Sequence, residues 1–376
     1  MKEKIAVLGA NEPLIPFYRQ AKALGYEIIG IAIEKGAVCK KYCDKFYPIS
    51  FADKDEVVEV CRKEKVDGII SFSLESALPT VSYVAQKLGL VSNSEESIKL
   101  TQSKFAQRQA LEKAGIPVPK YYLIELEDDL GKVNCRYPVI VKPVDSGGSQ
   151  GICKVDSPEK LLDSYKYAID YSRTSKAIVE EYVDGREFSV EYISHNGKHY
   201  FLQITDKVTS GAPRFVEMQH HQPADIPQSV WERIKTMVEG ALTALKIENS
   251  ASHTEIKWNS NDELYIIETG ARMGGDYISS DLVRLSTGYD FVEGVIKLAV
   301  NKFEEPSFPK RMNSGVYFFS KLAPEVGEII KNHEKWPEIV EWEYSDEPLM
   351  EVKSNADRRG YFIYQKNEVR FNKYSI

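Results

Sequence analysis

The hydrophobic and polar positions of the first 92 residues alternate between short apolar runs and longer amphipathic segments. The short runs have strand length, and the amphipathic segments carry apolar residues at helical spacing. Gly25 and Gly89 are placed to end two of the helices. Strands separated by helices imply a parallel sheet with crossovers, so a Rossmann-like domain is expected. Strands are predicted at 5–8, 27–33 and 68–72, and helices at 13–24, 53–64 and 77–88.

Beyond residue 92 the pattern becomes mixed. A linking helix is predicted at 101–114, ended by Gly115 and two prolines. The helix predicted at 228–245 has a long apolar stripe, which we interpret as core. Residues 306–376 combine prolines with short aromatic strands, as in a small α+β appendage. Further strands are predicted at 139–142, 177–183 and 187–193, and a helix at 158–171.

Composition and charge narrow the functional class. The chain is 43% hydrophobic and 28% charged, as in ordinary globular proteins, and its net charge of -7 argues against a nucleic-acid partner. No apolar run approaches the roughly 18 residues of a membrane span, and the N-terminus does not resemble a signal peptide. A cytoplasmic location without a membrane partner is expected. The five cysteines match no zinc spacing and are expected to be reduced thiols.

A glycine-rich loop follows the strand predicted at 139–142. Lys142 ends that strand, and the loop at 146–151 contains Ser146, Gly147, Gly148, Ser149 and Gly151. Backbone N–H groups of such a loop, with a lysine beside them, suit a phosphate. The loop is not a Walker A motif, and an exposed flexible hairpin is the alternative interpretation. The turn at 9–12 lacks the dinucleotide-binding glycine pattern.

Two carboxylates are predicted to oppose each other across a hairpin. If residues 261–262 form a two-residue turn, Trp258 pairs with Tyr265, Ile256 with Ile267, and Glu255 with Glu268. The apolar members of these pairs then share one face, and the carboxylates share the other. Opposed carboxylates repel, and a divalent cation with oxygen ligands such as Mg²⁺ compensates them. The alternative is a solvated face on which the side chains splay apart.

A basic turn follows the second carboxylate. Arg272 lies four residues after Glu268 and precedes Gly274 and Gly275. A guanidinium beside exposed backbone N–H groups suits an oxyanion or a phosphoryl oxygen. A surface arginine in a turn is the alternative.

Together these features resemble the ATP-grasp superfamily over roughly residues 1–300, and more narrowly its L-amino-acid ligase and carnosine synthase branch. The resemblance implies a Rossmann-like domain, a two-part ATP-grasp fold and a small α+β appendage. The predicted units are an N-terminal domain at 1–93, a linking helix at 94–115, a lid subdomain at 116–184, a catalytic subdomain at 185–305 and the C-terminal appendage at 306–376.

The resemblance also assigns roles to residues. Lys104, Lys142 and the glycine-rich loop would bind the ATP phosphates. Glu255 and Glu268 would hold Mg²⁺, and Arg272 with Gly275 would act at the acyl phosphate. Many family members have an Asn ligand where this chain has Gly270, so the number of magnesium ions stays open. The adenine and ribose residues would be Glu180, Glu181, Tyr182, Val183 and Glu187, and the residues bordering the substrate pocket would include Glu217, His220, His221 and His253.

The implied activity is ATP-dependent ligation of a carboxylate, expected to be an amino acid or a related acid, to an amine. An acyl phosphate and ADP would form first, and the amine would then displace phosphate. Arg272 and the backbone of Gly274 and Gly275 would stabilise the oxyanion, and Glu217 or His220 would act as base. Within the superfamily, a purine-pathway or carbamoyl-phosphate-type enzyme is the alternative, and a non-catalytic ATP-binding sensor is a further one. A homodimer is the commonest closed assembly.

Overall fold

The N-terminal segment forms a parallel four-stranded sheet in the order β3-β2-β1-β4, as the alternating pattern predicts. The computed structural model describes residues 2–148, 150–212, 214–367 and 371. Strand β3 was not predicted, because three residues are too few for a recognisable pattern. The elements of this sheet are β1 (Lys4–Leu8), α1 (Ile15–Ala23), β2 (Glu27–Ile31), β3 (Lys45–Tyr47), α2 (Lys54–Glu64), β4 (Gly68–Ile70) and α3 (Leu78–Leu88).

The predicted linking helix is divided at Ser103. Helix α4 (Glu95–Gln102) ends there and α5 (Lys104–Lys113) begins, so the prediction of one helix from Thr101 was wrong. Ser103 has extended backbone angles, and its side chain accepts a hydrogen bond from the Ala106 N–H at 3.2 Å. This N-cap starts a new helix and fixes its direction.

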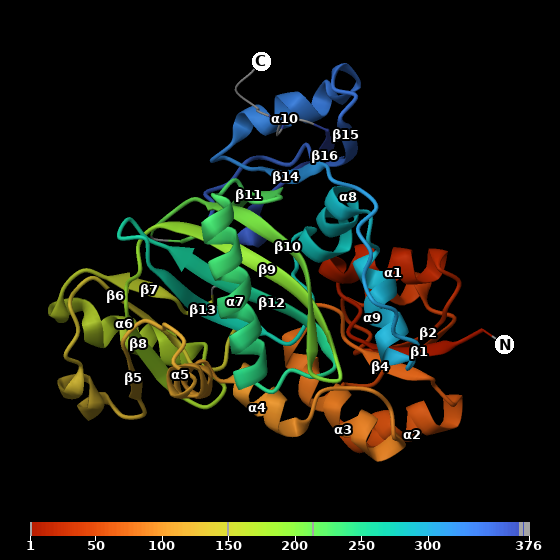
Figure 1. The fold of residues 1–376 in the computed structure, drawn as a ribbon, viewed down its shortest axis with the longest axis horizontal. Helices are drawn as coiled ribbons and strands as arrows, with labels where there is room; N and C mark the ends of the chain where they lie inside the picture. The colour runs from red at the N-terminus through yellow and green to blue at the C-terminus, as the bar shows by residue number, and fades with distance from the viewer. Residues whose placement is uncertain (1, 149, 213, 368–370, 372–376) are drawn as a thin grey trace.

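The segment predicted to be the lid subdomain contains a four-stranded antiparallel sheet, on the left of Figure 1, with strand order β5-β8-β6-β7. Its own small core lies between the sheet and α6. The elements are β5 (Tyr121–Ile124), β6 (Val139–Pro143), β7 (Cys153–Val155), α6 (Leu161–Asp170) and β8 (Ala177–Glu181).

An eight-stranded antiparallel sheet runs through the centre of the molecule, in the order β13-β12-β9-β10-β11-β14-β16-β15 (Figure 1). The stripe of α7 (Gln228–Ala244) packs on this sheet as predicted. The last three strands of the order come from residues 313–366, so the C-terminal part extends the central sheet. The strands are β9 (Arg186–His195), β10 (Lys198–Thr209), β11 (Glu217–Gln222), β12 (Ser250–Trp258), β13 (Leu264–Gly270), β14 (Asn313–Phe319), β15 (Ile339–Tyr344) and β16 (Gly360–Lys366).

The remaining helices connect these sheets. Helix α9 packs against the N-terminal sheet, and α10 covers the C-terminal strands. The architecture therefore agrees with the predicted parallel N-terminal domain, two-part central fold and α+β C-terminal part. These helices are α8 (Val283–Thr287), α9 (Phe291–Ala299) and α10 (Pro324–Lys331), with short turns at Glu12–Leu14, Val38–Tyr42, Glu75–Ala77, Glu127–Lys132, Pro158–Lys160, Ile278–Leu282, His333–Lys335 and Asn355–Asp357.

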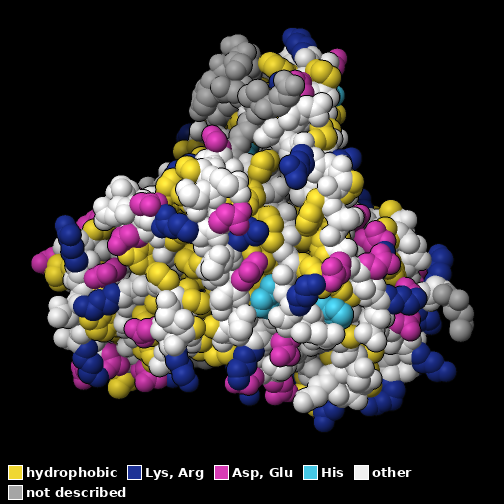
Figure 2. Space-filling model, viewed as in Figure 1, with side chains coloured by type: hydrophobic (Ala, Val, Ile, Leu, Met, Phe, Trp, Pro, Cys, Tyr) yellow, Lys and Arg dark blue, Asp and Glu magenta, His cyan; other side chains and the backbone are white. Residues whose placement is uncertain are grey.

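The surface carries lysine, arginine and carboxylate side chains interspersed with one another over the face in Figure 2. All five cysteines are free thiols, as predicted. Among the described residues, no helix combines the length and apolar character that a membrane span needs.

Gly185 joins the lid to the central sheet and admits no side chain. Its φ is +115°, and an added Cβ would lie 2.2 Å from the Trp258 carbonyl oxygen. We expect Gly185→Ala to lower the free energy of unfolding by about 2–4 kcal/mol, because both backbone strain and this clash must be relieved. Chemical denaturation measures the loss. Gly197→Ala is the matched control, since Gly197 has φ +75° with open space around it. An equal loss in both variants would contradict the role of the clash.

Candidate active site

Lys104 joins the linking helix to two predicted site elements. Its Nζ donates to the Ser146 carbonyl of the glycine-rich loop at 2.6 Å and to Glu268 Oε1 at 2.9 Å. The lysine is 5% exposed. Burial opposes its charge, but the carboxylates of Glu268 and Glu75 outweigh burial and raise the pKa of Lys104. The structure thus brings together a lysine, a loop and a carboxylate that are far apart in the sequence.

Lys142 is the penultimate residue of β6 and lies in a buried ion cluster. Its Nζ is 2.6 Å from Glu180 Oε2, and Glu180 Oε1 accepts a hydrogen bond from Arg108 Nε. Against the effect of burial, Arg108 and Lys142 lower the pKa of Glu180 to about 2. The Glu180 carboxylate is therefore engaged by two cations inside the protein. Arg108 is a residue that the sequence did not single out.

The glycine-rich loop connects β6 and β7. Gly148 and Gly151 have left-handed backbone angles, with φ of +66° and +71°. The Ser146 hydroxyl donates to the Tyr171 carbonyl, which ties the start of the loop to the end of α6. Gly147 lies near Glu75, a carboxylate from the N-terminal domain that the sequence analysis missed. The predicted site residue Ser149 lies outside the described residues.

The residues predicted to bind adenine lie at the end of β8 and in the segment that joins it to β9. The Glu181 N–H donates to the Lys120 carbonyl and the Tyr182 N–H donates to the Pro138 carbonyl. These two amides hold the lid together, so contacts to adenine would come from other backbone groups, such as those of the half-buried Val183. Lys154 Nζ lies over the Tyr182 ring, 4.2 Å from the ring centroid.

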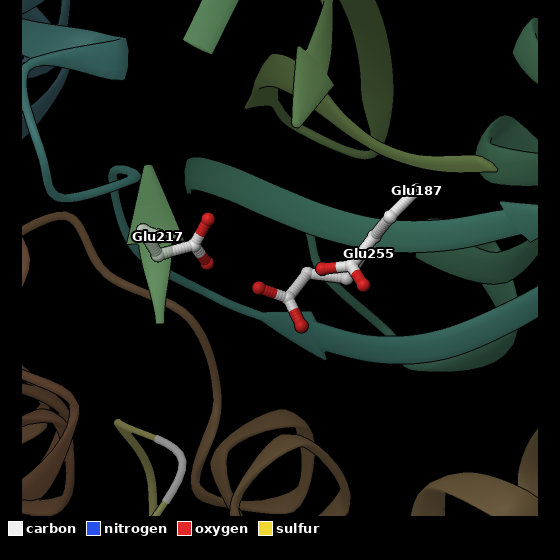
Figure 3. A group of neighbouring side chains, drawn as sticks. All are labelled: Glu187, Glu217 and Glu255. Carbon is white, nitrogen blue, oxygen red and sulfur yellow. The ribbon is translucent and has the colours of Figure 1, made fainter. Parts of the chain in front are cut away.

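Three carboxylates, those of Glu187, Glu217 and Glu255, lie together in Figure 3, and all three approach the ammonium group of Lys207. Lys207 Nζ is 3.0 Å from Glu187, 3.0 Å from Glu217 and 2.7 Å from Glu255, and its side chain is 2% exposed. Candidate ligand atoms of the three glutamates lie within 4.8 Å of one another. Burial and crowding by the other carboxylates raise the pKa of Glu217 to about 7, whereas Lys207 holds the pKa of Glu255 well below its usual range.

Glu255 and Glu268 are paired across β12 and β13, as predicted, but the rest of the predicted register was wrong. Near the turn Trp258 pairs with Leu264 and Ile256 with Ile266. The register then shifts by one residue between Glu255 and Ile256, so that Ile267 is the extra residue on β13. This β-bulge restores the opposition of the carboxylates. The buried face therefore contains Leu264 and Ile266, with Ile256 and part of Trp258, in place of Tyr265 and Ile267.

The turn after Glu268 is anchored by a buried hydrogen-bond chain. The Gly274 N–H donates to Ser279 Oγ at 2.7 Å, and the Ser279 hydroxyl donates to Glu191 Oε2 at 2.8 Å. His253 Nδ1 lies 2.6 Å from Glu191 Oε1. Although burial lowers it, the carboxylates of Glu191 and Glu255 raise the pKa of His253 to about 9. The expectation that the Gly274 amide binds an oxyanion was wrong, because Ser279 occupies it.

Arg272 faces the N-terminal domain from this turn. Its NH2 group lies 3.6 Å from Glu75 Oε2, and its NH1 group donates to the Met273 carbonyl at 3.0 Å. A Cβ at Gly270 would come within 3.3–3.4 Å of Arg272 side-chain atoms. The glycine therefore makes room for the guanidinium at the position where many ATP-grasp proteins have asparagine. Gly275, the other residue of this element, has open space around its α-carbon.

The two neighbouring histidines of β11 have different environments. His220 is fully buried, burial lowers its pKa well below the usual value, and within the described part of the chain its ring nitrogens have no hydrogen-bond partner. Its Nε2 is 3.8 Å from Glu217 Oε2, which is also without a hydrogen-bond partner there. His221 instead contacts Tyr364 and Gln219 through hydrogen bonds of 3.0 Å, an environment that favours a structural role.

The C-terminal segment reaches the same site. Arg358 donates to both carboxylate oxygens of Asp276, at 2.6 and 3.1 Å. Asn355 accepts a hydrogen bond from the Glu217 N–H at 3.1 Å and donates to Asp276 at 3.1 Å. No sequence signal identified these residues, because their proximity depends on β14 and β16 joining the central sheet.

A part of the chain that contains most of these site residues matches a known protein family. Residues 135–281 match the family described as ATP-grasp domain. Over these residues the chain is similar to an ATP-grasp domain. A formate-dependent phosphoribosylglycinamide formyltransferase from Ignicoccus hospitalis is 28% identical over 188 residues, 48% of this chain and 46% of that protein. An alanine–anticapsin ligase from Bacillus subtilis is 24% identical over 245 residues, 59% of this chain and 51% of that protein.

Solved structures share this ATP-grasp architecture along nearly the whole chain. An L-amino acid ligase from Bacillus licheniformis superposes with a TM-score of 0.81 at 22% identity, covering 98% of this chain and 94% of that one. The curated relatives are longer, and the matched region spans about half of their length. The likeness to the solved structure therefore shows the fold.

Proposed function

We propose that this protein is an ATP-dependent ligase that joins a carboxylate, an amino acid or related acid, to an amine through an acyl phosphate. The observation that carries the proposal is the convergence at Lys104, which links the glycine-rich loop to Glu268 opposite Glu255. A glycine-rich loop and a lysine beside two opposed carboxylates provide for both the phosphates and the metal of Mg·ATP. The similarity to L-amino acid ligase and alanine–anticapsin ligase supports the amino-acid class.

The donor set fits magnesium. Glu255 and Glu268 offer carboxylate oxygens from one face of the hairpin, and each uses Oε1 for a lysine contact. A bound Mg²⁺ would supply charge neutralisation at the transferred phosphoryl group. Lys104, Lys142 and the loop amides would orient the same phosphates, so that the substrate carboxylate attacks in line.

The remaining residues suit the second half of the reaction. Arg272 would stabilise negative charge on the acyl carbon's oxygen. Either neutral His220 or the carboxylate of Glu217 would accept the proton that the amine loses, because each has a polar atom without a hydrogen-bond partner and these atoms are 3.8 Å apart. Glu187 would contact the ribose hydroxyls, and its ion pair with Lys207 would then be weakened.

A substrate screen tests the proposal. The full chain, Mg²⁺ and ATP are incubated with pooled amino acids and small amines, and phosphate, ADP, AMP and pyrophosphate are measured. We expect ADP and phosphate only when a carboxylate and an amine are both present. AMP and pyrophosphate would contradict the acyl-phosphate route. Tight ATP binding without turnover in any pool would indicate a sensor.

The same screen tests the alternative of a purine-pathway or carbamoyl-phosphate-type enzyme, because one relative is named as a formate-dependent phosphoribosylglycinamide formyltransferase. Bicarbonate, formate and glycinamide-type amines are therefore included as separate pools. Turnover with these compounds alone would assign the chain to the carboxylating or formylating class and reject the amino-acid class.

A further inference from the structure

Strand β13 lies at the edge of the central sheet, and side chains of helix α5 bond to the backbone groups of two of its residues, Ile267 and Thr269. The Gln107 side-chain amide donates to the Thr269 carbonyl at 2.8 Å and accepts from the Thr269 N–H at 2.9 Å. One side chain thus makes the pair of hydrogen bonds that a neighbouring strand would make. Gln107 is 1% exposed, and its amide also donates to the Thr101 carbonyl at 2.6 Å.

Arg108 completes this contact at the bulge. Its NH2 group donates to the carbonyl of Ile267, the extra residue of β13, at 2.7 Å. A bulge residue is left without its ladder partner, and a buried unpaired carbonyl is costly. Lys104, Gln107 and Arg108 have the spacing that places them on one face of α5. This face therefore contacts three consecutive residues, Ile267, Glu268 and Thr269.

We propose that Gln107 and Arg108 are positioning residues that hold the bulge at Ile267 and thereby aim Glu268 at the nucleotide. Without the bulge, the register found near the turn would continue and pair Glu255 with Ile267. A slip of one residue moves each side chain to the opposite face, so Glu268 would point away from Glu255. The inference rests on the proposed function, because it assigns Glu268 to Mg²⁺.

The test is the effect of Mg²⁺ on ADP affinity, measured by calorimetry on the full chain. In the wild type we expect Mg²⁺ to tighten ADP binding. In Gln107→Leu we expect the Mg²⁺-dependent gain to fall by about 10–100-fold, as for other residues that orient a metal ligand, with metal-free ADP affinity unchanged. Gln109→Leu is the matched control, because Gln109 is exposed on the same helix and should retain the full gain.

Gln107→Glu provides a second variant of nearly the same shape. It keeps an acceptor for the Thr269 N–H but cannot donate to the Thr269 carbonyl, so we expect a loss of the Mg²⁺ effect even if Gln107→Leu does not fold. An unchanged Mg²⁺ effect in Gln107→Glu, or an equal loss of metal-free affinity, would overturn the inference alone. If Mg²⁺ does not change the ADP affinity of the wild type, both the proposed function and the inference are overturned.

Discussion

Glutamine in place of Glu268 is expected to reduce ATP-dependent phosphate release by on the order of 100-fold or more. The substitution removes one of two opposed carboxylates and the partner of Lys104, which is 2.9 Å away and 5% exposed. Shape and hydrogen-bonding capacity are retained, so the loss reports the missing charge. The measurement is kcat and KM for ATP with the substrates found by the screen, over a range of Mg²⁺ concentrations.

The control for Glu268→Gln is Glu248→Gln, a substitution of an exposed glutamate just before β12. It changes the net charge of the protein equally but lies outside the site, so its turnover should equal that of the wild type. Unchanged turnover in Glu268→Gln would refute the assignment of Glu268 to the metal. A loss confined to KM for ATP would instead assign Glu268 to nucleotide binding in the ground state.

The hairpin shows what the sequence can predict about this site. Two strands with a polar turn are evident from the alternation, and the opposition of Glu255 and Glu268 was predicted correctly. The intermediate pairs were wrong, because the turn is one residue longer on one side and the bulge at Ile267 compensates. Arg108 and Gln107 stabilise that bulge from another part of the chain. Local spacing does not contain this information.

The site residues that the sequence did not predict are charged residues whose partners lie far away in the sequence. No sequence signal singles out Lys207, whereas in the structure it balances three glutamates from β9, β11 and β12. Glu191 occupies an apolar strand as an isolated acid, and its partners His253 and Ser279 follow 62 and 88 residues later. A charged residue within a predicted apolar strand is the sequence signal that would have pointed to Glu191, because a charge buried there needs a partner.

Methionine in place of Lys207 is expected to lower the free energy of unfolding at pH 8 by about 3–5 kcal/mol, because three half-buried carboxylates lose the buried counter-charge that they share. Methionine retains much of the volume, so the loss is electrostatic. Chemical denaturation at several pH values measures it. Lys198→Met on the same strand is the control, because Lys198 is exposed and its salt bridge with Glu305 should contribute little.

The pH dependence of Lys207→Met separates charge from packing. In the wild type Lys207 holds the pKa of Glu255 well below its unfolded value, so the stabilisation from Glu255 is present above the unfolded pKa and is lost as the pH falls. Without Lys207, burial and mutual repulsion raise the pKa of Glu255 above that of the unfolded chain, and they raise the pKa of Glu217 further. The variant is then least impaired near pH 5, where the carboxyl groups bind protons, and its deficit grows towards pH 8. A deficit that is constant with pH would show that Lys207 contributes through packing of its alkyl chain and that the carboxylates relax apart.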